Sequence, residues 1–225
     1  MLIFISNSDH YKDVLSRVQS VKSTLWIGTA DIKDLYVEVG KEKKPFLALV
    51  AQLIRRGVEV RLIHAKEPGQ NFREDFDRYP ILYDRLERVL CPRVHFKILV
   101  FDCKEVYVGS ANLTGAGIGM KGDDKRNFEA GILTDDPEIV EQAMNQFDDV
   151  WIGKHCKTCL RRDFCPDPIR WFFHIIYFFQ SSALKRQGNL FTLWKKAYGI
   201  NRCYYSKNYA TWIVVRKDTA ISHRH

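Results

Sequence analysis

Apolar positions along the first 152 residues predict alternating strands and helices. Apolar runs typical of strands occupy residues 1–6, 24–29, 58–64, 94–102, 106–109 and 128–134. Helical spacing of apolar residues, as at Val14, Val18 and Val21, marks residues 10–21, 45–56, 83–89 and 139–151. This order predicts an α/β fold with a mixed central β-sheet flanked by helices.

The end of the chain has a different pattern. Residues 170–225 are aromatic and basic, with poor helical or strand periodicity. They hold ten Lys and Arg residues against the single acid Asp218, so the formal net charge of +8 originates in this tail. It reads as a small nucleic-acid-binding extension, an extra packing element, or a stretch from a shifted reading frame. We therefore assign no site residues to it.

Length and composition narrow the possibilities further. At 225 residues, with 46% hydrophobic residues, the chain suits one α/β domain plus an appendage, and two full catalytic domains would not fit. The first ten residues do not read as a signal peptide, and the longest apolar run, residues 171–179, is too short to span a membrane. We expect a cytoplasmic protein with no transmembrane segment, in which six cysteines indicate metal binding rather than disulfides.

One segment has the residue types of a chemical site. It contains His95, Lys97, Asp102, Ser110 and Asn112, in the spacing HxK(x)4D(x)6GSxN. At every fixed position it resembles the signature of the phospholipase D superfamily, in its branch with a single HKD motif and nuclease-like members. The resemblance covers residues 1–152, which we expect to form a phospholipase D-like catalytic domain.

The residues themselves support this interpretation. Side chains two apart on a strand share a face, so His95 and Lys97 would lie together, with a positive charge beside an imidazole. Ser110 and Asn112 follow the next strand and can direct donors to the same point, which suits an oxyanion. Asp102 would face away from Lys97, and its role in the family is positional; a purely structural carboxylate is the alternative.

A second match lies at Asn127-Phe128-Glu129, which resembles the N-x-E segment of the family. A carboxylate bonded to the far nitrogen of His95 would fix its tautomer, and we expect Glu129 to take that role. The alternative is an exposed glutamate at a strand end.

The resemblance also implies a mechanism. In the family one histidine attacks phosphorus to give a phosphohistidine, and a second histidine protonates the leaving oxygen. Because this chain has one motif, the second histidine would come from another copy, so we expect a homodimer with the site on its two-fold axis. No cofactor is needed for this catalysis.

A cysteine cluster follows the predicted catalytic domain, in residues 153–169. Cys156, Cys159 and Cys165 lie within ten residues of one another, and Cys91, also followed by proline, is the expected fourth ligand, with His155 as the rival. Structural zinc is the leading interpretation, with a [4Fe–4S] cluster or reduced thiols as alternatives.

The sequence thus predicts a phosphodiesterase, most simply a metal-independent nuclease. The loop at residues 121–126 and the basic tail would suit a nucleic acid backbone. The alternatives are a hydrolase or phosphatidyltransferase acting on cardiolipin-like phospholipids, and a nucleic-acid-binding module without catalysis.

Overall fold

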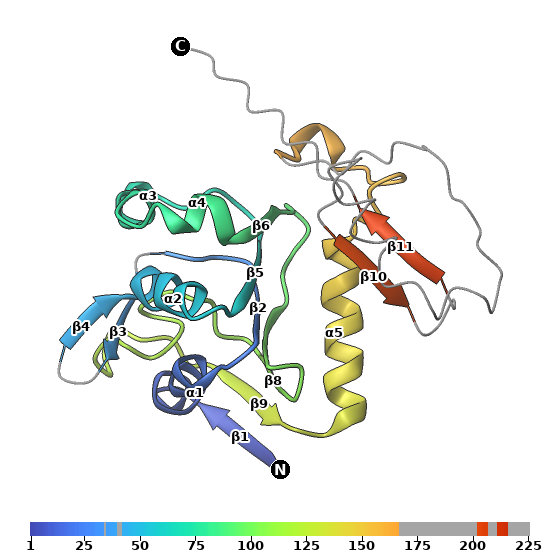
Figure 1. The fold of residues 1–225 in the computed structure, drawn as a ribbon. Coiled ribbons are helices and arrows are strands. Elements are labelled where there is room, and N and C mark those ends of the chain that lie inside the picture. The colour runs from blue at the N-terminus through green and yellow to red at the C-terminus, as the bar shows by residue number, and fades with distance from the viewer. Residues whose placement is uncertain (34, 40–41, 167–201, 207–210, 216–225) are drawn as a thin grey trace. The chain divides into compact units, whose positions relative to one another are not determined.

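A seven-stranded mixed sheet forms the centre of the protein (Figure 1). The computed structural model describes residues 1–33, 35–39, 42–166, 202–206 and 211–215, with the backbone alone at 39, 202–206 and 211–215. The strand order is β1-β9-β8-β7-β2-β5-β6. The strands are β1 (Leu2–Ser6), β2 (Thr24–Thr29), β5 (Glu59–His64), β6 (Glu87–Leu90), β7 (Lys97–Phe101), β8 (Glu105–Gly109) and β9 (Ala130–Thr134). The predicted α/β fold with a mixed central sheet is confirmed.

Helices cover both faces of this sheet, so its central strands are buried on both sides. On one face lie α1 (Leu15–Ser20) and α2 (Phe46–Arg55), and on the other lies α5 (Pro137–Trp151) (Figure 1). Alternate residues of β7 therefore enter different cores: Leu99 packs with the α1 and α2 side, and Val100 packs with α5. All five residues of β7 are buried, which makes it a rigid base for the residues at its ends.

Several smaller elements complete this part of the chain. They are the π-helix η1 (His10–Val14), the hairpin β3 (Tyr36–Val39) and β4 (Glu42–Pro45), α3 (Gln70–Asp77), α4 (Ile81–Arg85) and the 3-10 helix η2 (Arg162–Phe164). The helix predicted over residues 83–89 is wrong, because α4 ends at Arg85 and β6 pairs with the parallel edge of β5. The hairpin and α3 were not predicted; α3 buries only Phe72, Asp75 and Phe76.

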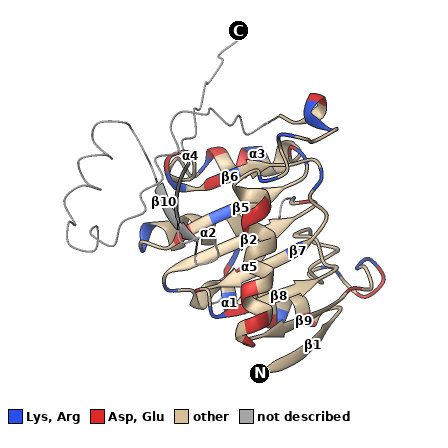
Figure 2. Ribbon diagram, turned by 90° about the vertical axis from the view of Figure 1, so that its right-hand side faces the viewer, with Lys and Arg blue, Asp and Glu red and all other residues tan. Residues whose placement is uncertain are grey.

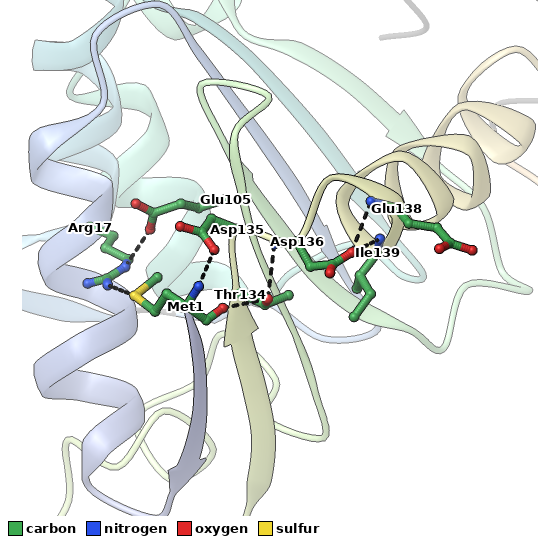
Figure 3. A network of polar contacts seen from close by, with 8 residues as sticks. All are labelled: Met1, Arg17, Glu105, Thr134, Asp135, Asp136, Glu138 and Ile139. Atoms are coloured by element: carbon green, nitrogen blue, oxygen red, sulfur yellow. Dashed lines mark hydrogen bonds and ion pairs between the residues drawn. The ribbon is translucent and has the colours of Figure 1, made fainter.

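Polar contacts close the sheet edge at which β1 begins and β9 ends (Figure 3). The Thr134 hydroxyl donates to the carbonyl of Met1 at 2.7 Å, and Arg17 pairs with Glu105 at 2.7 Å. The Asp136 carboxylate accepts the backbone N–H groups of the first turn of α5, at 3.0 and 3.1 Å. All of these contacts are structural, and the predicted site residues lie elsewhere.

The chain divides into two compact units, Met1–Pro168 and Ile169–His225. In the second, β10 (Arg202–Ser206) and β11 (Thr211–Val215) form an antiparallel pair. The rest of the basic tail, including the aromatic run 171–179, lies outside the described residues. Within the described part of the chain, no helix has the length and apolar character needed to cross a membrane.

Candidate active site

The predicted site residues gather at one edge of the sheet. The pairings place the ends of β1, β2, β5 and β8 at the same edge as the beginnings of β7 and β9. Lys97 begins β7, Ser110 follows β8 and Glu129 precedes β9. Strand β2 runs parallel to β5 on one side and antiparallel to β7 on the other. This end of the sheet therefore carries both loops that follow strands and loops that precede them.

His95 lies in the loop before β7 and is exposed to solvent. The expected strand over residues 94–102 begins only at Lys97, because the ladders of β7 with β2 and β8 start at Ile98 and Lys97. Next to His95, the Phe96 ring fills the space over Gly28, where an added Cβ would lie 2.3 Å from a ring carbon. Any larger residue at Gly28 would displace this ring, so the close contact fixes the loop that presents His95.

Lys97 is a buried cation beside this loop. The residue is 6% exposed, and its Nζ donates to the carbonyl oxygen of His95 at 2.8 Å. Burial lowers the pKa of Lys97, and the carboxylate of Glu129 acts in the opposite direction. An ammonium has three donors, so the group can still bind an anion, which would offset the cost of burying its charge.

Ser110 and Glu129 form a hydrogen-bonded pair on the neighbouring strand ends. The Ser110 hydroxyl donates to one carboxylate oxygen of Glu129, and the Asn127 amide donates to the other at 3.0 Å. The structure therefore differs from the expectation that Glu129 bonds to the far nitrogen of His95. Here Glu129 orients Ser110, and its expected role toward His95 stays a prediction.

Asn7 fixes the backbone of Glu129, a contact that sequence reasoning missed. Its N–H donates to the Glu129 carbonyl at 3.0 Å, and its side-chain oxygen accepts from the Glu129 N–H at 3.2 Å. Asn7 has φ of 44°, in the left-handed region that asparagine tolerates better than most residues. The signal in the sequence was the polar run Asn-Ser-Asp directly after the first strand.

The side chain of Asn112 is oriented by the loop after β2. Its Oδ1 accepts from the backbone N–H of Asp31 at 3.1 Å and lies 3.3 Å from the Thr29 hydroxyl. Fixing the oxygen also fixes the amide nitrogen, which has two N–H donors for a ligand. Gly117 packs on the same residue, since a Cβ there would lie 2.6 Å from the Asn112 carbonyl oxygen.

Asp102 lies at the other end of β7 and does not join this group. Its carboxylate accepts the backbone N–H groups of Lys22, Ser23 and Thr24, at distances of 2.7–3.1 Å. Burial acts to raise the pKa of Asp102, but these hydrogen bonds together outweigh it, so the pKa lies below its usual value. The structure does not support the inclusion of Asp102 among the catalytic candidates, because it lies five residues after Lys97, just beyond the opposite end of β7, where its hydrogen bonds favour the structural alternative.

Two other histidines in this region are unsuited to a second catalytic role. His10 and His64 are both fully buried. His64 accepts from Arg88 Nε at 2.6 Å and contacts the Lys66 carbonyl at 2.7 Å through Nδ1, and burial is the main cause that lowers its pKa to about 4. It is therefore a neutral structural histidine, and His95 is the exposed histidine at this edge.

The cysteines predicted as metal ligands line one small pocket. Cys91, Cys156, Cys159 and Cys165 surround a cavity of about 30 Å³, whereas His155 is exposed. In the described residues, however, no group of three or more His, Cys, Asp or Glu side chains is arranged to hold a metal ion. The expected zinc or [4Fe–4S] site is thus not supported by the present side-chain arrangement.

Comparisons with known proteins give the fold a wider context. No curated protein matches the chain. Among solved structures, NucT from Helicobacter pylori has 17% identity and a TM-score of 0.50, over 66% of this chain and 94% of its own. Nuc from Salmonella typhimurium, described as a phospholipase D family member, also has 17% identity and a TM-score of 0.50, over 67% and 93%.

A third structure differs in length. Phosphatidylserine synthase from Haemophilus influenzae has 15% identity and a TM-score of 0.52, over 66% of this chain but 36% of its own. These likenesses establish the fold. At the level of sequence, residues 14–151 match the family described as "Cardiolipin synthase, PLD-like domain". Since this match covers more than half of the chain, the protein belongs to the phospholipase D-like family.

Proposed function

We propose that this protein is a nuclease that cleaves phosphodiester bonds through a phosphohistidine at His95, in a site completed by a second copy of the chain. The observation that supports this best is the combination of exposed His95 with buried Lys97 and oriented Ser110 and Asn112 at one sheet edge. These groups can neutralise a pentacoordinate phosphate without a metal ion.

The proposed reaction proceeds in two displacements. A ring nitrogen of His95 attacks phosphorus, the bond to the leaving oxygen breaks, and the imidazole of the second copy protonates that oxygen. Water then attacks phosphorus and gives its proton to the second imidazole, and the bond from phosphorus to His95 breaks. Each displacement pairs a nucleophile with one proton transfer, so both histidines return to their starting states.

Exposed apolar residues near the site support pairing of two copies. Phe128, adjacent to Glu129, is 94% exposed, and Phe4, on the outermost strand β1, is 71% exposed. Apolar side chains of this size at an unpaired sheet edge favour burial against a partner. A second copy on this side would cover them and bring another His95 toward the same edge.

The distribution of charge favours a polyanionic substrate at this edge. Lys33 and Lys66, in the loops after β2 and β5, lie 3.5 and 3.4 Å from Asp31 and are 56% and 63% exposed. By contrast, α5 has four acids and no lysine or arginine, and Figure 2 shows red along this helix. A nucleic acid would therefore be attracted to the loops of the site and repelled by the face that α5 covers.

A phospholipid substrate is the second candidate. It is favoured by the fold that the chain shares with a phosphatidylserine synthase.

The expected cytoplasmic location and the role of the tail at residues 170–225 stay predictions.

Cleavage assays in chelator test the proposed substrate. Labelled single- and double-stranded DNA and RNA would be incubated with the wild type and with His95→Ala, beside vesicles containing cardiolipin. We expect cleavage of nucleic acid by the wild type alone. Release of lipid products without nucleic acid cleavage would favour the lipid enzyme, and tight nucleic acid binding without turnover would indicate a non-catalytic module.

Mixing experiments test the shared site. A nine-fold excess of His95→Ala chain, exchanged into wild-type dimers, should reduce the activity per wild-type chain to about one tenth, because random pairing leaves few dimers with two histidines. If the activity per wild-type chain were unchanged in the mixture, each chain would contain a complete site.

A further inference from the structure

The segment after α5 has an unusual pattern of burial. From residue 154 to residue 166 the side chains are exposed, with three exceptions, which are Cys156, Cys159 and Cys165. Its large apolar residues point outward, since Leu160 is 97% exposed and Phe164 is 74% exposed. Burial of apolar side chains therefore does not hold this segment in place, and the inward-facing groups are thiols.

These three thiols meet a fourth that is distant in sequence. Cys91 follows β6 directly, its N–H donates to the His64 carbonyl at 2.9 Å, and it lines the same pocket of about 30 Å³. The Cys165 thiol lies 3.9 Å from the carbonyl of Leu90, at the end of β6. Two segments more than sixty residues apart thus direct four cysteines to one point.

We propose that this pocket binds a single thiophilic metal ion, such as Zn²⁺, through the thiolates of Cys91, Cys156, Cys159 and Cys165. Four thiolates are a complete tetrahedral ligand set for structural zinc. The side chains do not yet form a closed ligand set. Metal binding would release the thiol protons to solvent, and the resulting thiolates would be drawn to the ion by side-chain rotation.

The surroundings of the pocket suit such a site in charge and size. Zinc with four thiolates has a net charge of −2, and Arg93, Arg161 and Arg162 line the pocket, with Arg93 3.8 Å from the Cys159 sulfur. The cavity is small, about 30 Å³, which suits a single ion.

The proposed ion would link the end of α5 to the loop that presents His95. Cys91 begins that loop, and the Val94 N–H donates to the Cys91 carbonyl at 2.9 Å. Binding of the ion would therefore restrict the backbone before His95, while no metal ligand would take part in the displacement at phosphorus.

Metal analysis of the full chain tests this proposal. The wild type and three variants, Cys159→Ala, Cys159→His and Cys103→Ala, would be produced with zinc and iron in the medium, and their metal content measured by mass spectrometry. We expect about one zinc ion per chain in the wild type, in Cys159→His, where imidazole replaces thiolate, and in the control Cys103→Ala, whose exposed cysteine lies in the turn after β7. Cys159→Ala should lose the ion.

A spectroscopic measurement guards against unfolded variants. Cobalt exchanged into the wild type should show the absorption of a tetrahedral tetrathiolate site, and chelator should lower the melting temperature reversibly. The proposal is overturned if the wild type binds no stoichiometric metal, if Cys159→Ala keeps as much as the wild type, or if the purified chain contains four irons with sulfide.

Discussion

The two edges of the central sheet differ in what their polar side chains do. At the edge where β7 begins, His95 is exposed and Lys97 is a buried cation whose bond to the protein is to a backbone carbonyl. At the edge where β7 ends, Asp102 accepts three backbone N–H groups of residues 22–24. One strand is thus flanked by an exposed histidine and a buried cation at one end and by a fully hydrogen-bonded carboxylate at the other, although the signature in the sequence includes both.

The largest expected effect is at the first edge. His95→Ala should lower kcat on nucleic acid on the order of 10⁴-fold or more, because it removes the nucleophile. Because His95 is exposed, its loss should leave the melting temperature almost unchanged. Kinetics and calorimetry on the same preparation measure both quantities. A variant with normal activity, or one that loses activity only by unfolding, would remove the distinction between the two edges.

Asp102→Ala should give the reverse result. The loss of a charged acceptor for three N–H groups should lower the free energy of unfolding by about 1–3 kcal/mol. The kcat of the folded variant at 25 °C should stay close to that of the wild type. Denaturant titration and single-turnover kinetics would check this, with the exposed neighbour Lys104→Ala as a control. A large fall in kcat with unchanged stability would place Asp102 in the chemistry.

The sequence predicted six of the seven strands of the sheet, the helices that cover it, and the gathering of His95, Lys97, Ser110, Asn112 and Glu129 at one edge. The apolar spacing of the elements and the fixed spacing of the motif depend on local geometry, which the sequence reflects directly. The sequence did not predict β6, because this strand is defined by its parallel pairing with β5 rather than by the pattern of apolar residues within it.

Contacts between distant segments were also beyond the sequence. The pairing of Asn7 with Glu129 depends on a left-handed residue at Asn7 and on register between β1 and β9. The orientation of Asn112 depends on the backbone N–H of Asp31. Nearly every residue has such a group, so the identity of Asp31 does not reveal this contact. Motif spacing indicated which residues gather at this edge, while packing determined how each is oriented.

Asn7 offers a smaller test of how the active edge is held. Asn7→Gly keeps the left-handed backbone accessible but removes the acceptor for the Glu129 N–H, a bond of about 1 kcal/mol. We expect kcat to fall about five-fold, with KM unchanged, because Ser110 and Glu129 lose alignment. Asn7→Asp, which keeps the acceptor, should restore most of the rate. Equal rates in all three proteins would show that Asn7 stabilises the loop without positioning the site.

The smallest expected effect is in the pH dependence of the structural edge. Because the folded protein holds the pKa of Asp102 below its unfolded value, the carboxylate contributes stability above the unfolded pKa, and this contribution is lost as the pH falls through the folded pKa. The difference in unfolding free energy between the wild type and Asp102→Asn should therefore be full at pH 7 and shrink toward pH 2. Urea titrations at a series of pH values measure it. A difference that stayed constant down to pH 2 would mean that the hydrogen bonds of Asp102 do not depend on its charge, and the contrast between the two edges would then be one of geometry alone.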